Sequence, residues 1–342
     1  MGLRGFIAKR LLNTLILIVF VITVNFVIFE LMPGVQGAIL NLVSSPRNNQ
    51  NPTEVQRLLV LYNLCTGFVD GKCVPKPVWD RFVAYFFNML TLQFGDSFQT
   101  GNPVLHDMIQ TGRLENTLLL LGISTVMSLL IGTLLGVIVA RKRGTFFDSG
   151  AVTTSLVTFS LPTFWIGLVL IIVFSQNLNW FPPGSTAPAV WAFARPDLFN
   201  FVLGRTQYLF LPVLTLTLFF YGGHLLLTRA SMLEVLSEDY ITTARAKGVS
   251  ERSIIFKHAL KNAALPLITN AALSFGTILS GAIITETVFN WDGMGLWIFN
   301  SIGFKDFPVM QAIFFIVALC VIGANFISDI LYGIIDPRIK YS

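Results

Sequence analysis

Six long apolar runs, separated by polar segments, dominate the hydrophobic pattern of the chain. A hydrocarbon core about 30 Å thick takes about 20 mostly apolar residues of helix, and a helix satisfies its own backbone hydrogen bonds in lipid. We therefore expect transmembrane helices at residues 11–32, 117–140, 149–174, 209–228, 263–289 and 308–335. The pattern predicts an all-α polytopic membrane protein with six transmembrane helices.

The composition excludes a soluble multidomain enzyme. Hydrophobic residues make up 54% of the 342 positions and charged residues 12%, against about 25% charged residues in soluble domains. The formal net charge of +5 would suggest a nucleic-acid partner in a soluble protein. In a membrane protein the same surplus is interpreted through topology.

The basic residues predict the orientation in the membrane. Both termini are expected in the cytoplasm, because short loops on the other side then hold only Arg195, Arg205 and Lys305. Six more basic residues lie in the segment 33–116, and loops of that length count little in the positive-inside rule. The 14 residues on the cytoplasmic side are Arg4, Lys9, Arg10, Arg141, Lys142, Arg143, Arg229, Arg245, Lys247, Arg252, Lys257, Lys261, Arg338 and Lys340.

The pattern divides the chain into three parts. Residues 1–32 hold the N-terminus and first span, residues 33–116 form a large extracytoplasmic cap loop between the first two helices, and residues 117–342 form the core transmembrane domain, with a cytoplasmic loop at 229–262. The first apolar run has basic residues before it, as a signal peptide has. It is longer than the roughly 7 to 15 residues of a signal core, so we interpret it as a retained anchor.

The cap loop is too long for an unstructured connection in a compact protein. Pro77 is a helix-start signal, and the spacing after it predicts an amphipathic helix on the membrane or on the bundle. Its apolar residues would be Val78, Trp79, Phe82, Val83, Phe86 and Met89. A floppy loop is the alternative, although so aromatic a stretch is not typical of disorder.

Two of the three cysteines, Cys65 and Cys73, lie in the cap loop, and Cys320 lies in the sixth span. An oxidising exterior favours a disulfide between Cys65 and Cys73 around a hairpin. Two free thiols are the alternative, because sequence does not fix the Cα separation. Metal binding by two cysteines without a nearby histidine is not expected.

Catalytic motifs are absent from the sequence. The three histidines are isolated, and no HExxH, Gly-x-Ser-x-Gly or Gly-x-x-x-x-Gly-Lys-Ser/Thr motif occurs. An intramembrane hydrolase is disfavoured for want of a nucleophile and base. We expect a non-catalytic chain that binds no cofactor of its own.

Ionisable residues within spans are costly and therefore candidates for function. Glu30 and Glu286 lie at the outer ends of spans one and five, where each either faces a pathway or sits at the interface. No carboxylate lies near a span midpoint and no charge ring occurs, which disfavours a channel or an ion-gradient-driven carrier. Pro162 should kink the third span, and Gly132 with Gly136 should pack closely against another helix.

The cytoplasmic loop predicts a helix, a break and a second helix. Ser237 can cap the first helix, whose first turn holds Glu238 and Asp239, and Gly248 follows its last turn. Ser250 can cap the second helix, which continues into the fifth span. A solvated charged loop is the alternative.

Small groups at Thr243, Ala244 and Gly248 on the first helix would let another protein approach closely, and its mixed charges would set orientation. We interpret it as a docking helix. A bulky residue at Ala244 or Gly248 is then expected to prevent docking.

Several motifs carry a family resemblance. They read Asp-Tyr-Ile-Thr-Thr-Ala-Arg-Ala-Lys-Gly at 239–248, Lys-His-Ala-Leu-Lys-Asn-Ala-Ala-Leu-Pro at 257–266, Phe-Gly-Asp-Ser at 94–97, Leu-Pro-Thr-Phe-Trp-Ile-Gly at 161–167, and Asp-Ile-Leu-Tyr at 329–332 with Asp-Pro-Arg at 336–338. Nearly the whole chain resembles the permeases of the dipeptide and oligopeptide family of ABC importers, and residues 239–263 resemble their EAA-type coupling loop. The glutamate that names this motif is replaced by Thr242.

The resemblance implies a permease in a prokaryotic inner membrane that forms half of a pathway for peptides. Its expected partners are a second homologous permease, two cytosolic ATPases that bind ATP and magnesium, an extracytoplasmic binding protein and membrane lipid, with no nucleic acid. The residues implied to contact an ATPase are Glu238, Asp239, Tyr240, Thr243, Ala244, Arg245, Lys247 and Gly248.

The resemblance leaves the substrate open among dipeptides, oligopeptides, oligosaccharides and nickel chelates. It also leaves two roles open for four aromatic residues near the outer ends of the spans, which either dock the binding protein or form the interfacial aromatic belt. These residues are Trp180, Phe181, Trp291 and Trp297.

Overall fold

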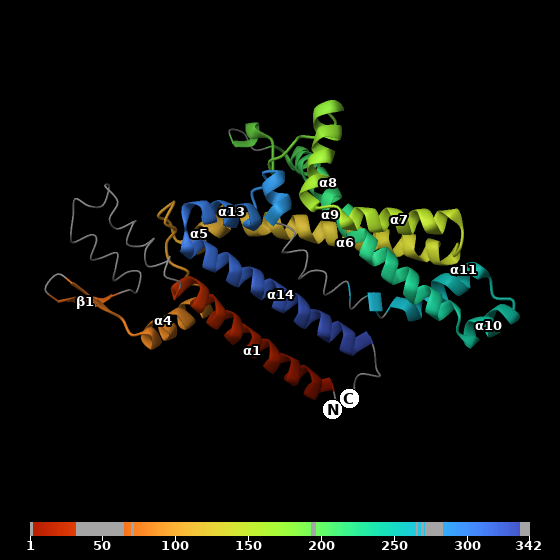
Figure 1. Cartoon of the computed structure of the whole chain (residues 1–342), viewed down its shortest axis with the longest axis horizontal. Coiled ribbons are helices and arrows are strands. Elements are labelled where there is room, and N and C mark those ends of the chain that lie inside the picture. The colour runs from red at the N-terminus through yellow and green to blue at the C-terminus, as the bar shows by residue number, and fades with distance from the viewer. Residues whose placement is uncertain are drawn as a thin grey trace. The chain divides into compact units, whose positions relative to one another are not determined.

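A computed structural model describes residues 3–31, 65–69, 72–192, 196–264, 266–267, 270 and 283–335. Most of these residues are helical (Figure 1). The chain divides into two compact units. Unit 1 comprises Met1–Arg10, Leu114–Leu296 and Gly323–Ser342, and unit 2 comprises Leu11–Arg113 and Trp297–Ile322.

Long helices make up most of unit 1. Its elements are α6 (Arg113–Arg141) from Leu114 onward, α7 (Phe146–Ser160), α8 (Thr163–Leu170), the π-helix η1 (Ile171–Asn177), the 3-10 helix η2 (Ala189–Ala192), α9 (Leu198–Leu236), α10 (Asp239–Ala246), α11 (Glu251–Ser253) and the π-helix η3 (Ile254–Ala259). Helix α9 packs against α7 and α8. At 39 residues and a rise of about 1.5 Å per residue, it is ~58 Å long and exceeds a membrane core.

Unit 2 contains most of α1 (Leu3–Glu30), the strands β1 (Cys65–Val69) and β2 (Lys72–Pro75), α4 (Val78–Leu90), α5 (Val104–Gln110), most of α13 (Met294–Phe304) and the first half of α14 (Phe307–Ile335). The two strands are an exception to the predicted all-α class, and they form the hairpin predicted between the two cysteines. They pair antiparallel, with Phe68 opposite Cys73 and Cys65 opposite Pro75. The side chains of these two cysteines lie outside those that the structure describes. Their disulfide therefore stays a prediction.

Five of the predicted spans fall on apolar helices. The ranges Gly5–Glu30, Arg113–Arg141, Leu198–Leu236 and Phe307–Ile330 are each long and apolar enough to cross a membrane, and α7 with α8 and η1 forms a fifth candidate that is bent by 102°. The predicted span 263–289 lies mostly outside the described residues. Six spans and cytoplasmic termini therefore stay predictions, whereas a polytopic helical membrane protein is supported.

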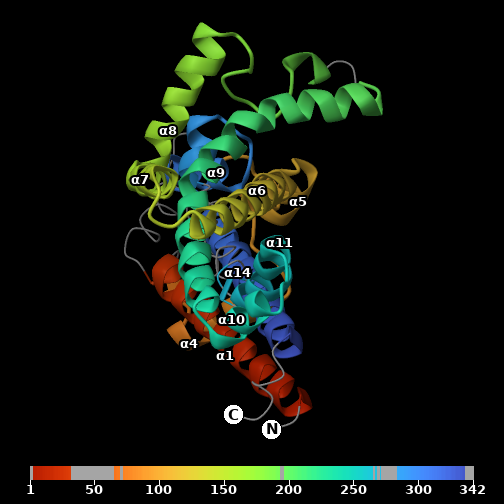
Figure 2. The ribbon, with the colours of Figure 1, turned by 90° about the vertical axis from the view of Figure 1, so that its right-hand side faces the viewer.

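The bend between α7 and α8, in the third predicted span, occurs at Pro162. Helix α7 ends at Ser160, Leu161 is extended, and α8 begins at Thr163. A proline has no N–H for the helix ladder, and its ring disfavours helical backbone at the residue before it. The predicted kink is confirmed, and Figure 2 shows α8 turning away from α7.

Two glycines allow α6 to approach α9 closely. A Cβ atom at Gly132 would lie 2.6 Å from the carbonyl oxygen of Tyr221, and one at Gly136 would lie 2.7 Å from that of Leu225. Both distances are shorter than van der Waals contact, so any side chain at these positions would push the helices apart. The predicted close packing at this small-residue pair is confirmed.

The amphipathic helix predicted after Pro77 is α4, and its predicted apolar side is confirmed in part, because Met89 is buried and Phe82, Val83 and Phe86 are half-buried. It buries Arg81, Tyr85 and Met89, while Trp79 is exposed. Arg81 donates from Nη2 to Glu30 at the end of α1, both to the carboxylate at 2.5 Å and to the backbone oxygen at 2.9 Å. A basic residue normally lies on the solvent side of such a helix, so the burial of Arg81 follows from its partner Glu30 and not from the spacing of apolar residues.

The Phe-Gly-Asp-Ser motif folds around a buried aspartate of unit 2. The hydroxyl of Ser97 donates to Asp306 Oδ2 at 2.5 Å, and the N–H groups of Phe98 and Gln99 donate to the same carboxylate at 3.1 Å each. Asp306 lies between α13 and α14 in the chain. The motif therefore ties the end of the cap segment to the turn before the last helix.

Candidate functional site

Helix α10 is a short, sharply bounded helix after the end of α9. The predicted cap is corrected: Ser237 ends α9 and donates to the Glu234 carbonyl at 2.6 Å, and Glu238 occupies the N-cap position of α10. Asp239 lies in the first turn and Arg245 in the last, as the helix dipole favours. Helix, break and helix are confirmed, since α11 begins at Glu251.

The end of α10 is a Schellman motif. Gly248 has a φ of +77° and donates its N–H to the Arg245 carbonyl at 2.9 Å, while Val249 donates to the Ala244 carbonyl at 3.2 Å. This left-handed conformation is open to glycine and costly for other residues. Nothing lies within 4 Å of a Cβ built at Gly248, so the glycine serves the backbone turn.

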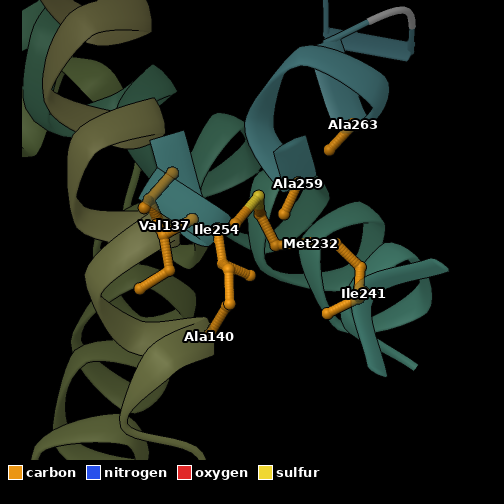
Figure 3. Close-up of a cluster of buried hydrophobic side chains, with 8 residues drawn as sticks. Val137, Ala140, Met232, Ile241, Ile254, Ala259 and Ala263 are labelled. Carbon is orange, nitrogen blue, oxygen red and sulfur yellow. The ribbon is translucent and has the colours of Figure 1, made fainter. Parts of the chain in front are cut away.

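Ile241 is the one residue of α10 that is completely buried. It lies in a cluster with Val137 and Ala140 of α6, Met232 of α9, and residues that follow α10 (Figure 3). The latter are Ile254, Ile255, Ala259 and Ala263. The prediction from sequence missed Ile241, although it is the only aliphatic residue larger than alanine between 239 and 248.

The outer side of α10 is solvent-exposed. The exposed residues are Glu238, Asp239, Tyr240, Thr242, Thr243, Arg245, Ala246, Lys247 and Gly248. Ala244 is half-buried and packs against the Ile241 cluster. A bulky residue at Ala244 would therefore disturb internal packing, and one at Gly248 would strain the turn, so neither tests an outer surface cleanly.

Two side-chain contacts tie α10 to the segment after it. Arg245 pairs with Glu251 at 2.9 Å, and both side chains are about half exposed. Asn262 donates from Nδ2 to the Tyr240 hydroxyl at 2.7 Å. Thr242, which replaces the glutamate of the family motif, is exposed. An exposed pair contributes little free energy, so the Ile241 cluster is the main attachment.

A shallow groove of about 340 Å³ lies on the segment that follows α10. It is lined by Ser250, Arg252, Ser253, Phe256 and Lys257. Phe256 is exposed, as are both basic residues. The exposed side of the loop therefore continues from α10 into a basic and partly apolar depression.

Glu30, a candidate for the pathway, is engaged by the buried guanidinium of Arg81. Tyr85 lies beside this pair, and burial first, then the charge of Glu30, raises the pKa of the Tyr85 phenol. The phenol therefore stays neutral at physiological pH. Within the described residues no group of three or more His, Cys, Asp or Glu side chains could hold a metal ion. A pathway role for Glu30 stays a prediction.

Glu286, the second candidate for the pathway, is completely buried within unit 1. The hydroxyl of Thr117 donates to its Oε1 at 2.6 Å, and the N–H groups of Gly295 and Leu296 donate to its Oε2 at 2.7 and 3.0 Å. Thr117 Oγ1 accepts the N–H of Met294 at 2.8 Å. Sequence alone could not bring α6 and the start of α13 to this carboxylate.

The interpretation of Trp291 as an interfacial or docking residue is wrong, because its side chain is completely buried. Its Nε1–H donates to the Asn116 carbonyl at 3.1 Å, and the guanidinium of Arg205 lies 5.2 Å from its ring centre. Trp297 is also buried, whereas Trp180 is 63% exposed. Of these tryptophans, only Trp180 retains the predicted surface position.

The helical architecture and the apolar candidate spans indicate a polytopic membrane protein. The sequence model for the binding-protein-dependent transport system inner membrane component matches residues 132–341. This match covers more than half of the chain, so the protein belongs to that family of inner-membrane permease components. It is therefore a multi-pass inner-membrane protein and not itself an enzyme.

Individual relatives narrow this class to the peptide permeases of ABC transporters. The chain is 34% identical over 340 residues to the oligopeptide transport system permease protein AppB of Bacillus subtilis, covering 99% of this chain and 100% of the relative. It is 38% identical over 277 residues to the di/tripeptide permease DppB of Pseudomonas aeruginosa, and 36% identical over 280 residues to the dipeptide permease DppB of Escherichia coli K12. Each of these two alignments covers 78% of this chain and 82% of the relative.

Proposed function

We propose that the chain is the transmembrane permease subunit of an ATP-driven peptide importer, that it forms half of the translocation pathway, and that it couples to a cytosolic ATPase through α10. The main support is that α10 has an exposed polar surface and an inner side held by Ile241 in a buried cluster, which also includes residues of α6, α9 and η3. A docking element that transmits force needs both properties. The relatives AppB and DppB are oligopeptide and di/tripeptide permeases, which supports peptides as the substrate class.

The proposed complex contains a second homologous permease, two cytosolic ATPases and an extracytoplasmic binding protein, all in or at a lipid membrane. ATP and magnesium are bound by the ATPases, because this chain has no P-loop motif. The Arg252 and Lys257 groove beside α10 would add a basic rim to the same contact, which favours an acidic edge on the ATPase.

Coupling would proceed through packed side chains. When the ATPases close on ATP, the exposed surface of α10 moves with them. Ile241 leaves little free space around it, and packed cores are displaced as units more readily than they are deformed. The motion would therefore reach the ends of α6 and α9 and bias the bundle between inward-open and outward-open states.

The substrate within the peptide class is tested by competition. Uptake of a labelled dipeptide by cells that carry the complete transporter should fall when unlabelled di- or oligopeptide is added. The alternatives of the same family, an oligosaccharide or a nickel chelate, should not compete. Competition by either of these and not by peptides would contradict the proposed substrate class.

The docking surface is tested by Thr243→Trp. The Thr243 side chain is exposed and its hydroxyl donates to the Asp239 carbonyl at 3.0 Å, so a tryptophan there should leave the fold intact and obstruct a partner. We expect recovery of the ATPases with the purified permease to fall tenfold or more, which corresponds to about 1.4 kcal/mol of binding free energy.

Thr206→Trp is the matched control. Thr206 is also exposed and its hydroxyl also donates to the carbonyl four residues earlier, but it lies in the first part of α9, before the predicted span 209–228. This variant should recover the ATPases normally. Equal recovery in the Thr243 and Thr206 variants would contradict the assignment of α10 as the docking helix.

A further inference from the structure

The start of α13 is held by a buried carboxylate instead of a local cap. Three consecutive N–H groups of its first turn, those of Met294, Gly295 and Leu296, are accepted by Thr117 of α6 and by Glu286. Hydrogen bonds to a carboxylate are stronger than those between neutral groups, and negative charge is favourable at a helix N-terminus. Glu286 therefore joins α13 to α6 through the Thr117 hydroxyl.

Two glycines make room for this arrangement. A Cβ atom at Gly293 would lie 2.6 Å from the carboxyl carbon of Glu286, and one at Gly295 would lie 2.6 Å from Ile283 Cα. A side chain at Gly293 or Gly295 would therefore displace the carboxylate or the backbone around it. The spacing Glu286, Gly293 and Gly295 is thus explained by close approach to one buried group.

The turn before α13 has a separate anchor. The side chain of Trp291 packs in a cluster with Leu120 and Leu121 of α6 and with Leu209 and Leu216 of α9. Removal of the Glu286 carboxylate would leave this apolar attachment in place. Loss of the Glu286 hydrogen bonds should therefore free the first turn of α13 while unit 1 stays folded. A defect in transport without a loss of folding would then indicate a positioning role.

We propose that Glu286 is a positioning residue for transport, whose carboxylate clamps the first turn of α13 to α6. The end of the fifth predicted span, the 290–293 turn and the start of α13 then move as one body. The coupling loop lies at the other end of that predicted span. The clamp would therefore transmit motion of the coupling loop to the predicted extracytoplasmic entrance. This last step rests on the proposed function, whereas the clamp itself does not.

Amide hydrogen exchange measures the clamp directly. In the intact transporter complex, the amides of Gly295 and Leu296 should be protected, and Glu286→Ala should speed their exchange about 10- to 100-fold, as expected for loss of charge-assisted bonds. Thr117→Val should act in the same direction, and Thr117→Ser, which keeps the hydroxyl, should resemble the wild type. Unchanged exchange at these amides in Glu286→Ala would overturn the clamp.

Uptake measures the positioning role. Glu286→Ala and Gly293→Ala should lower the rate of dipeptide uptake tenfold or more at normal membrane level and normal ATPase recovery, while Glu286→Gln, which keeps one acceptor oxygen, should restore part of the rate. If Glu286→Ala does not reach the membrane, the uptake rates of Gly293→Ala and Thr117→Val test the positioning role instead. Faster exchange with unaltered uptake would overturn the positioning role, and wild-type complexes that fail to transport peptides would instead contradict the proposed function.

Discussion

Replacement of Ile241 by alanine should detach α10 from the bundle and abolish transport. The side chain is completely buried among residues of α6, α9 and η3, and loss of such a side chain costs about 2–5 kcal/mol. Helix α10 has eight residues, and isolated helices shorter than about 12–15 residues are marginal in water. The cluster is therefore what keeps α10 folded, so the purified variant should lose the ATPases and show no peptide uptake.

Two control variants separate coupling from general stability. Ile166 is buried in another cluster of unit 1, with Phe289 and Leu211, so Ile166→Ala should lower the melting temperature and still retain the ATPases. Ile241→Val removes one methylene and should keep most of the uptake. Normal ATPase recovery and normal uptake in Ile241→Ala would contradict transmission through this residue.

Replacement of Gly136 by valine should force α6 and α9 apart and lower the stability of unit 1. The new Cβ would lie 2.7 Å from the carbonyl oxygen of Leu225 and 2.6 Å from Thr228 Cβ. Overpacking of a core typically costs about 1–3 kcal/mol, and a backbone oxygen cannot rotate away as a side chain can. We expect the purified variant to melt several degrees below the wild type and to reach the membrane in smaller amounts.

Gly122→Val is the matched control for this prediction. Gly122 is also on α6, and nothing lies within 4 Å of a Cβ built there. The valine should therefore leave melting temperature and membrane level close to the wild type. A Gly136→Val protein as stable as the Gly122→Val protein would show that α6 and α9 do not pack as described.

Sequence predicted those features that follow from local pattern. The length of the apolar runs predicted the helices that form the candidate spans. Pro162 predicted the break between α7 and α8, and Gly248 predicted the end of α10. In each case one residue type or one run of residues has a direct effect on the backbone. The order of elements in the coupling loop followed from the same signals.

Features that depend on tertiary contacts could not be predicted from sequence. From sequence, Arg81 is expected at the surface, but α4 places it against Glu30. Trp291 was interpreted as an interfacial residue, but the turn before α13 buries it against α6 and α9. Ala244 reads as a small surface group but packs inward. The buried side of a short helix depends on the elements that it packs against. The spacing of apolar and polar residues within the helix does not identify those elements.

Peptide uptake into proteoliposomes measures whether the transporter is driven by ATP through α10. The vesicles would contain the chain with its partner permease, both ATPases and the binding protein, with ion gradients collapsed by ionophores. We expect a labelled dipeptide to accumulate with ATP and not with a non-hydrolysable analogue. Thr243→Trp should abolish this uptake, whereas Thr206→Trp should not. Uptake driven by an imposed ion gradient without ATP would show that the transporter is an ion-coupled carrier and not an ATP-driven importer.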